Sequence, residues 1–99
     1  MAKLNIARPI MGDAPNRQSI EWRSKPIHLV ELIYALYHSG SVGDVKLKDL
    51  FEFFESTFNI KLSNFSHTYG RIRGRSGERC LFLYKLLQDL TVAMELKDR

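Results

Sequence analysis

Residues 47–73 read LKDLFEFFESTFNIKLSNFSHTYGRIR, and this stretch decides the fold that we expect. Its first half has apolar residues every three or four positions, which predicts a helix over about 48–58. These positions are Leu47, Leu50, Phe51, Phe54 and Phe58. The second half repeats the spacing with Phe65, Tyr69 and Ile72, which predicts a helix over about 64–73 that Ser63 caps. Two short helices joined by a brief connection are typical of a helix-turn-helix.

One further helix is expected on each side of this stretch. Ser24 and Pro26 are typical of a helix start and Gly40 of a helix end, which predicts a helix over about 25–39. Apolar residues cover most of its circumference, so we expect it to be the central helix of the core. A last helix is expected from Ser76 to about residue 96, with an apolar arc broad enough to cover the other three helices.

The rest of the chain is expected to be extended. Residues 1–18 include Pro9, Gly12 and Pro15 without a steady period, which predicts an extended or disordered arm followed by one domain over 19–99. Segments 19–22 and 45–47 have the alternation of short strands and are candidates for a minimal β-ribbon beside the helices. The predicted fold is therefore a mainly α, four-helix helix-turn-helix domain, with a winged-helix-like ribbon as an open option.

Helical spacing also predicts which side chains form the core around the central helix. The expected core residues are Trp22, Ile33, Leu36, Leu50, Phe54, Phe58, Phe65, Tyr69 and Ile72. We expect Cys80 to be a small core residue as well. Glu31 lies among apolar residues of the central helix, and we expect its side chain to be solvated or hydrogen-bonded.

Charge is distributed unevenly along a chain whose net charge is +4. Residues 44–58 contain two lysines and four acidic residues, whereas residues 61–85 contain six basic residues and only Glu78 as an acid. A local basic excess favours polyanions such as nucleic acid, because neutralising phosphates releases counterions. The expected phosphate contacts are Lys46, Lys48, Lys61, Arg73, Arg75 and Arg79. A solvated basic face without a nucleic-acid partner has the same composition, so charge alone does not distinguish a nucleic-acid-binding protein from one that binds no nucleic acid.

The outer face of the helix expected at 64–73 is rich in side chains that pair with base edges. Asn, Arg, Ser and Thr are the residue types that read the major groove, and arginine is the natural bidentate partner of guanine. The expected base contacts are Asn64, His67, Thr68 and Arg71. A surface helix that only faces solvent is the alternative, although lysine and glutamate are its usual residues.

The composition gives no indication of catalysis, a cofactor or a membrane. A single cysteine and three scattered histidines provide no metal-ligand spacing. No nucleophile with a base and no suitably placed pair of carboxylates is evident, so we expect neither an enzyme nor a small-molecule substrate. No run reaches the roughly 18 apolar residues of a membrane span, and the start lacks a signal-peptide core. We therefore expect a cytoplasmic protein.

The sequence also resembles the C-terminal part of the RteC family, over residues 22–90. The residues that carry the resemblance are Trp22, Lys25, 29–36, Ser39, Gly40, Phe54, Glu55, 58–60, Leu62, Phe65, 71–73, Arg79, Phe82 and Leu83. The family comprises regulators from conjugative transposons of the Bacteroides group, associated with tetracycline-responsive excision. The resemblance implies an all-helical DNA-binding domain that activates excision genes. Compared with the family, we expect this chain to be either an isolated domain or a short paralogue without the larger N-terminal domain. It has Gly74 and Arg75 where an Arg-Lys pair is usual in the family.

Two functional hypotheses follow from these observations. The first is a regulator that binds double-stranded DNA through the helix at 64–73. The second is a protein-interaction or dimerisation module that keeps the fold without binding DNA. The broad arc of the last helix suggests a homodimer in either case, because surplus apolar surface on a small domain often binds a second copy.

Overall fold

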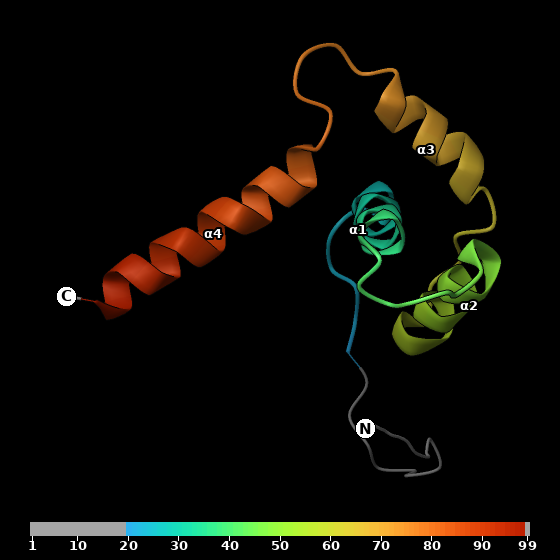
Figure 1. Cartoon of the computed structure of the whole chain (residues 1–99), viewed down its shortest axis with the longest axis horizontal. Helices are drawn as coiled ribbons and strands as arrows, with labels where there is room; N and C mark the ends of the chain where they lie inside the picture. The colour runs from blue at the N-terminus through green and yellow to red at the C-terminus, as the bar shows by residue number, and fades with distance from the viewer. Residues whose placement is uncertain (1–19, 99) are drawn as a thin grey trace, which may run out of the picture.

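The computed structural model describes residues 20–98, and this part of the chain is helical (Figure 1). Its four helices are α1 (Pro26–Ser39), α2 (Leu47–Phe58), α3 (Phe65–Arg73) and α4 (Leu81–Lys97). The mainly α fold is thereby confirmed. Residues 20–98 contain no strand, and Leu47 is already the first residue of α2, so the ribbon expected at 45–47 is not formed. The arm expected at 1–18 lies outside the described residues.

Helix α1 is the centre of the molecule, as its apolar arc predicts. Each of the other three helices contacts it, and it lies between α2, α3 and the start of α4 in Figure 1. Its side chains Leu29, Val30 and Ile33 are at most 1% exposed. Fully burying such a side chain contributes about 1.5–3 kcal/mol, so this line of α1 is the main source of cohesion.

The ends of α1 and α2 follow from local chemistry. Gly40 ends α1 in the left-handed conformation, with φ of 78°, as expected for a glycine after the last helical turn. Asn59 ends α2 in the same conformation, with φ of 52°. The two predicted N-caps are wrong, because Lys25 precedes α1 and Asn64 precedes α3. The Ser24 hydroxyl instead lies 3.2 Å from His28 Nδ1.

The start expected for the last helix is also wrong, by about one turn. Residues 74–80 form an irregular loop, and α4 begins only at Leu81. Gly77 adopts φ of 71° in this loop, which no right-handed helix accommodates. Cys80 precedes α4 and is exposed, so it is not the core residue that we expected.

The predicted core is confirmed in part. Ile33, Leu50 and Ile72 are buried, whereas the other six expected residues are half-buried. Trp22, one of those six, packs edge-on against Phe58 and Phe82. Its Nε1–H donates a hydrogen bond to the Lys25 carbonyl at 2.9 Å. The largest of the fully buried side chains is Phe51, which is 1% exposed. The inward face of α2 is therefore centred on Leu50 and Phe51 rather than on Phe54.

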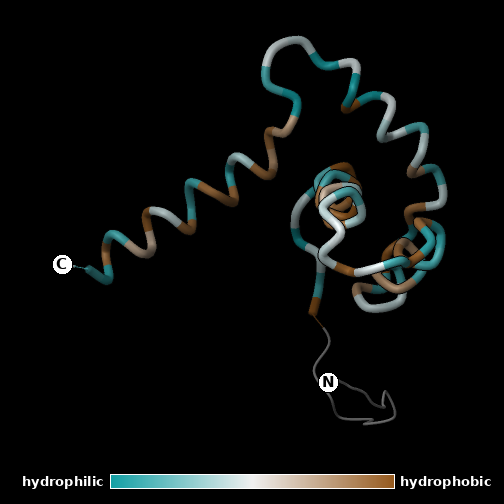
Figure 2. Tube along the Cα trace, in the orientation of Figure 1, coloured by the Kyte–Doolittle hydropathy of each residue, from teal (hydrophilic) through white to brown (hydrophobic). Residues whose placement is uncertain are grey.

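Helix α4 does not cover the other three helices, contrary to expectation. Among the described helices it contacts α1 alone, and it then extends away from the body (Figure 1). Phe82 is buried against Trp22 and His28, Leu83 is half-buried, and every later residue of the helix is exposed. Figure 2 shows apolar residues along the whole of this protruding helix.

The first prediction compares two phenylalanines of α2. Phe51→Ala should lower the free energy of unfolding by about 3–5 kcal/mol, because it removes a fully buried ring and leaves a cavity. Phe53 is 62% exposed, so Phe53→Ala should change stability by less than about 0.5 kcal/mol. Thermal and denaturant melts measure both variants. Equal losses would show that the inward face of α2 is assigned wrongly.

Candidate nucleic-acid interface

Two ring stacks hold α3 against the body. Tyr69 stacks on Tyr34 of α1 with centroids 3.6 Å apart and planes within 2°. Phe65 stacks on Phe51 of α2 with centroids 3.9 Å apart and planes within 8°. One stack lies near the start of the helix and the other one turn later. The two anchors fix which face of α3 points outward.

The outward face of α3 presents most of the side chains predicted to contact bases. Asn64, His67 and Arg71 are exposed, and Thr68 is half-buried at the margin of the face. Between them, a Cβ added at Gly70 would meet no atom within 4 Å, so the surface is open at this point. The face therefore combines polar side chains with room for a close partner.

A shallow groove brings three predicted contact residues together at the start of α3. Lys61, Asn64 and Thr68 line it opposite Pro26 and Ile27 of α1. Sequence spacing alone places Asn64 and Thr68 on one face, but the position of Lys61 beside them depends on the connection between α2 and α3. This corner therefore joins a predicted phosphate contact to two predicted base contacts.

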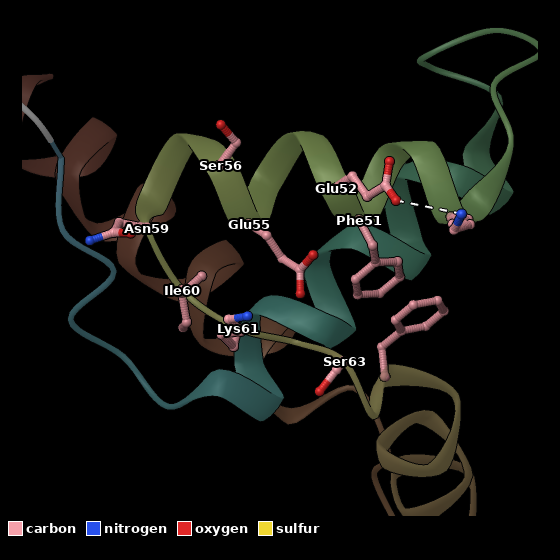
Figure 3. A pocket seen from close by; sticks show the side chains of 10 residues that line it. Phe51, Glu52, Glu55, Ser56, Asn59, Ile60, Lys61 and Ser63 are labelled. Atoms are coloured by element: carbon pink, nitrogen blue, oxygen red, sulfur yellow. Dashed lines mark ion pairs between the residues drawn. The ribbon is translucent and has the colours of Figure 1, made fainter.

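Glu55 fixes that connection. Its carboxylate accepts a hydrogen bond from the backbone N–H of Leu62, a buried residue in the middle of the connection. Figure 3 shows Glu55 directed from α2 toward the connection, in the cleft between the two. Glu55 is therefore a structural residue of the turn.

The cleft in Figure 3 has mixed charge. Lys48, Glu52, Glu55 and Lys61 all line it, together with Ser63. The Lys48 ammonium lies 3.7 Å from the Glu52 carboxylate, and both side chains are largely exposed. Lys48 and Lys61 thus line the same cleft from separate segments, beside two acidic neighbours.

Arg75 differs from the other predicted phosphate contacts. Its side chain is only 22% exposed and lies 3.5 Å from the Glu31 carboxylate. It also donates to the Arg79 carbonyl at 2.6 Å. Arg75 therefore links α1 to the loop before α4, and its predicted phosphate contact stays a prediction. The remaining basic candidates are exposed, namely Lys46, Lys48, Lys61, Arg73 and Arg79.

Glu31 has partners that its sequence neighbourhood does not predict. Its side chain is 3% exposed, and besides Arg75 it binds the backbone N–H of Leu83 at 2.9 Å. This N–H belongs to the first turn of α4, where Cys80 provides no side-chain cap within the described structure. The expectation of a hydrogen-bonded Glu31 is confirmed. Its partners lie 44 and 52 residues away, so no local pattern identifies them.

Two side chains with shifted pKa values belong to the core rather than to the outward face of α3. Burial lowers the pKa of His28, against the opposing effect of Glu31, and its ring stacks on Phe82 with centroids 4.7 Å apart. Burial also raises the pKa of Tyr34, with a further contribution from Tyr69. Both shifts follow from packing.

Within residues 20–98, no three His, Cys, Asp or Glu side chains are grouped so that they could hold a metal ion. None of the helices described here is both long and apolar enough to cross a membrane.

The helices and their packing define a small, mainly α-helical domain. The profile of the family described as RteC protein matches residues 1–98, so the chain belongs to the RteC family. This match confirms the resemblance noted from the sequence. No curated protein and no solved structure matches the chain.

The second prediction concerns the turn between α2 and α3. Glu55→Ala should cost about 1–3 kcal/mol of stability, because it leaves the buried N–H of Leu62 without its acceptor. Glu52→Ala removes the other carboxylate of the cleft, which has only an exposed ion pair, and should cost less than about 1 kcal/mol. Urea melts compare the two. A smaller loss for Glu55→Ala than for Glu52→Ala would contradict the role of the turn carboxylate.

The third prediction concerns the attachment of α4. Glu31→Ala leaves the Leu83 N–H without its acceptor and the half-buried Arg75 guanidinium without its counter-charge, so it should cost about 2–4 kcal/mol. Hydrogen exchange of the Leu83 amide should also be faster in the Glu31→Ala variant than in the native chain. Glu21→Ala, which removes an exposed acid paired with Arg23, is the matched control and should leave both measurements unchanged. Unchanged protection of Leu83 in the Glu31 variant would refute the contact.

Proposed function

We propose that this chain binds double-stranded DNA in a sequence-specific manner and regulates transcription, with α3 as the reading helix. The observation that carries the proposal is the exposed, acid-free outer face of α3. Residues 61–77 contain no aspartate or glutamate, and Asn64, His67 and Arg71 are exposed on this segment. A segment whose outward residues are base-pairing types, and which itself carries no carboxylate, fits the major groove.

The anchoring of α3 supports the proposal energetically. Stacking of Phe65 and Tyr69 on the body holds the helix before any DNA is bound. Little ordering of the backbone is then required on binding, which removes one of the usual costs of association. Arg71 would bind the O6 and N7 atoms of a guanine, and Asn64 would pair with an adenine. His67 and Thr68 would complete the contacts from the same helix.

The phosphate contacts follow from the exposed cations around α3. Lys46 precedes α2 and Lys48 lies in its first turn, where the helix dipole is also positive. Arg73 ends α3, and the Arg79 guanidinium donates to the Arg73 carbonyl at 3.3 Å. Lys61 lies beside the start of α3. The acidic outer residue Asp49 of α2 would face away from the DNA backbone, whereas Glu52 is paired with Lys48 and would have to release it for a phosphate contact.

Membership of the RteC family supports the biological part of the proposal. The resemblance to that family implies regulators from conjugative transposons, so the target genes would serve excision or transfer. Such a regulator would act in the cytoplasm. A protein-interaction module without DNA binding is the second candidate, and the exposed apolar residues of α4 favour it.

The fourth prediction separates base contacts from phosphate contacts. After selection of bound duplexes from a random pool, Arg71→Ala should weaken binding to the preferred duplex by about 1–3 kcal/mol and relax the preference at one base pair. Arg79→Ala should weaken binding to all duplexes alike and reduce the salt slope by roughly 0.9. Titrations at two salt concentrations measure both effects.

Arg23→Ala is the control for these titrations. Arg23 is an exposed arginine paired with Glu21, away from α3 in the sequence, and its loss should leave binding unchanged. Absence of salt-dependent binding to any duplex at micromolar concentration would overturn the proposal. Unchanged binding by both the Arg71 and Arg79 variants would do the same, and the interaction module would then be the better candidate.

A further inference from the structure

Helix α4 carries an apolar stripe that leaves the body. Leu83, Leu87, Leu90 and Met94 recur at intervals of four, three and four residues, which is the spacing of the contact positions of a coiled coil. Leu87, Leu90 and Met94 are each between 52% and 60% exposed. We call these four residues the α4 stripe. Exposed apolar surface of this regularity marks an interaction site.

The α4 stripe is continuous with the core. Leu83, its first residue, lines an apolar pocket together with Tyr34, Tyr69 and Ile72. The next residues of the same line lie beyond the body, where Figure 2 shows apolar residues along the protruding helix. Lys85 and Asp89, paired at 2.6 Å, lie on the opposite side of α4 by helix geometry. The stripe thus extends the core into solvent along one side of the helix.

We infer that the α4 stripe binds the α4 stripe of a second copy of this chain, with the two helices antiparallel. In this register Leu87 of one copy faces Leu90 of the other, and Leu83 faces Met94. Every layer of the interface is then apolar, and the two-fold symmetry repeats each contact. The stripe is therefore complementary to itself, which is the requirement for an isologous dimer.

The charges around α4 favour the antiparallel direction. Residues 71–85 contain five basic residues and one acid, whereas residues 89–98 contain three acids and one lysine. Antiparallel pairing places the acidic end of each α4 beside the basic loop of the other copy. Parallel pairing would instead bring the two basic bodies together and align the two helix dipoles.

The contact of Glu31 with the Leu83 N–H prepares α4 for this pairing. It holds the first turn of the helix against α1, so the α4 stripe leaves the body in a defined direction. A helix that is fixed before association loses less conformational entropy when it binds. Dimerisation of this kind does not depend on DNA binding, and it would supply two copies of α3 related by a two-fold axis.

Sedimentation equilibrium and light scattering on the full chain test the inference. The native chain should be a dimer that dissociates on dilution. Leu87→Lys and Leu90→Lys should each weaken dimerisation by roughly 30-fold or more, as expected for central interface residues. Both side chains lie outside the body, so the variants should keep the far-ultraviolet spectrum of the native fold. Val92→Lys changes an exposed residue off the stripe and should leave the dimer intact.

Disulfide formation tests whether the two α4 helices pair antiparallel. The antiparallel register places Cys80 of one copy opposite Lys97 of the other. Oxidation of an equal mixture of the native chain and a Cys80→Ser/Lys97→Cys variant should therefore give a mixed disulfide dimer. The variant alone should remain uncrosslinked. A native chain that is monomeric at high concentration, or stripe variants that dimerise normally, would overturn the inference. A disulfide between two variant chains would overturn the antiparallel arrangement.

Discussion

The attachment of α3 by two ring stacks is the interaction on which the proposed function depends. Tyr34 and Phe51 each present a flat ring from a different helix, and Tyr69 and Phe65 of α3 lie against them. Such pairs contribute about 0.5–1.5 kcal/mol each beyond the burial of their surface. More important is the geometry, because two flat contacts on one short helix fix its rotation. The outward direction of Asn64, His67 and Arg71 follows from that rotation.

The same central helix also sets the direction of α4. One side of α1 is buried and consists of Leu29, Val30 and Ile33. On the same helix, Glu31 places its carboxylate at the start of α4. A buried carboxylate is costly unless it is hydrogen-bonded and paired, and here it has both a backbone donor and an arginine. The Arg75 guanidinium that neutralises it comes from the loop between α3 and α4. The Glu31 carboxylate of α1 therefore joins the loop and α4 to α1 through polar contacts beside the apolar core.

Helical spacing was sufficient to find α1, α2 and α3, because each has a regular inward face, and Gly40 marks the end of α1. Helical spacing was insufficient where contacts between distant residues determine where a helix begins or what it packs against. The late start of α4 depends on Gly77 and on the pairing of Arg75 with Glu31, which local sequence does not reveal. Similarly, a broad apolar arc showed that α4 has a surface to bury but not where its partner lies. For the candidate site, residue type and spacing identified the outward face of α3. The contact of Arg75 with Glu31 was not predicted, because an arginine in a basic loop gives no local sign of a distant carboxylate.

The most direct test of the central account is the change in backbone amide shifts when an isotopically labelled chain is titrated with its selected duplex. The largest changes should fall on residues 61–73, at the start and outer face of α3. Asp49, on the outer face of α2, should change little. Changes concentrated on α2 or α4, with α3 unaffected, would contradict the assignment of α3 as the reading helix.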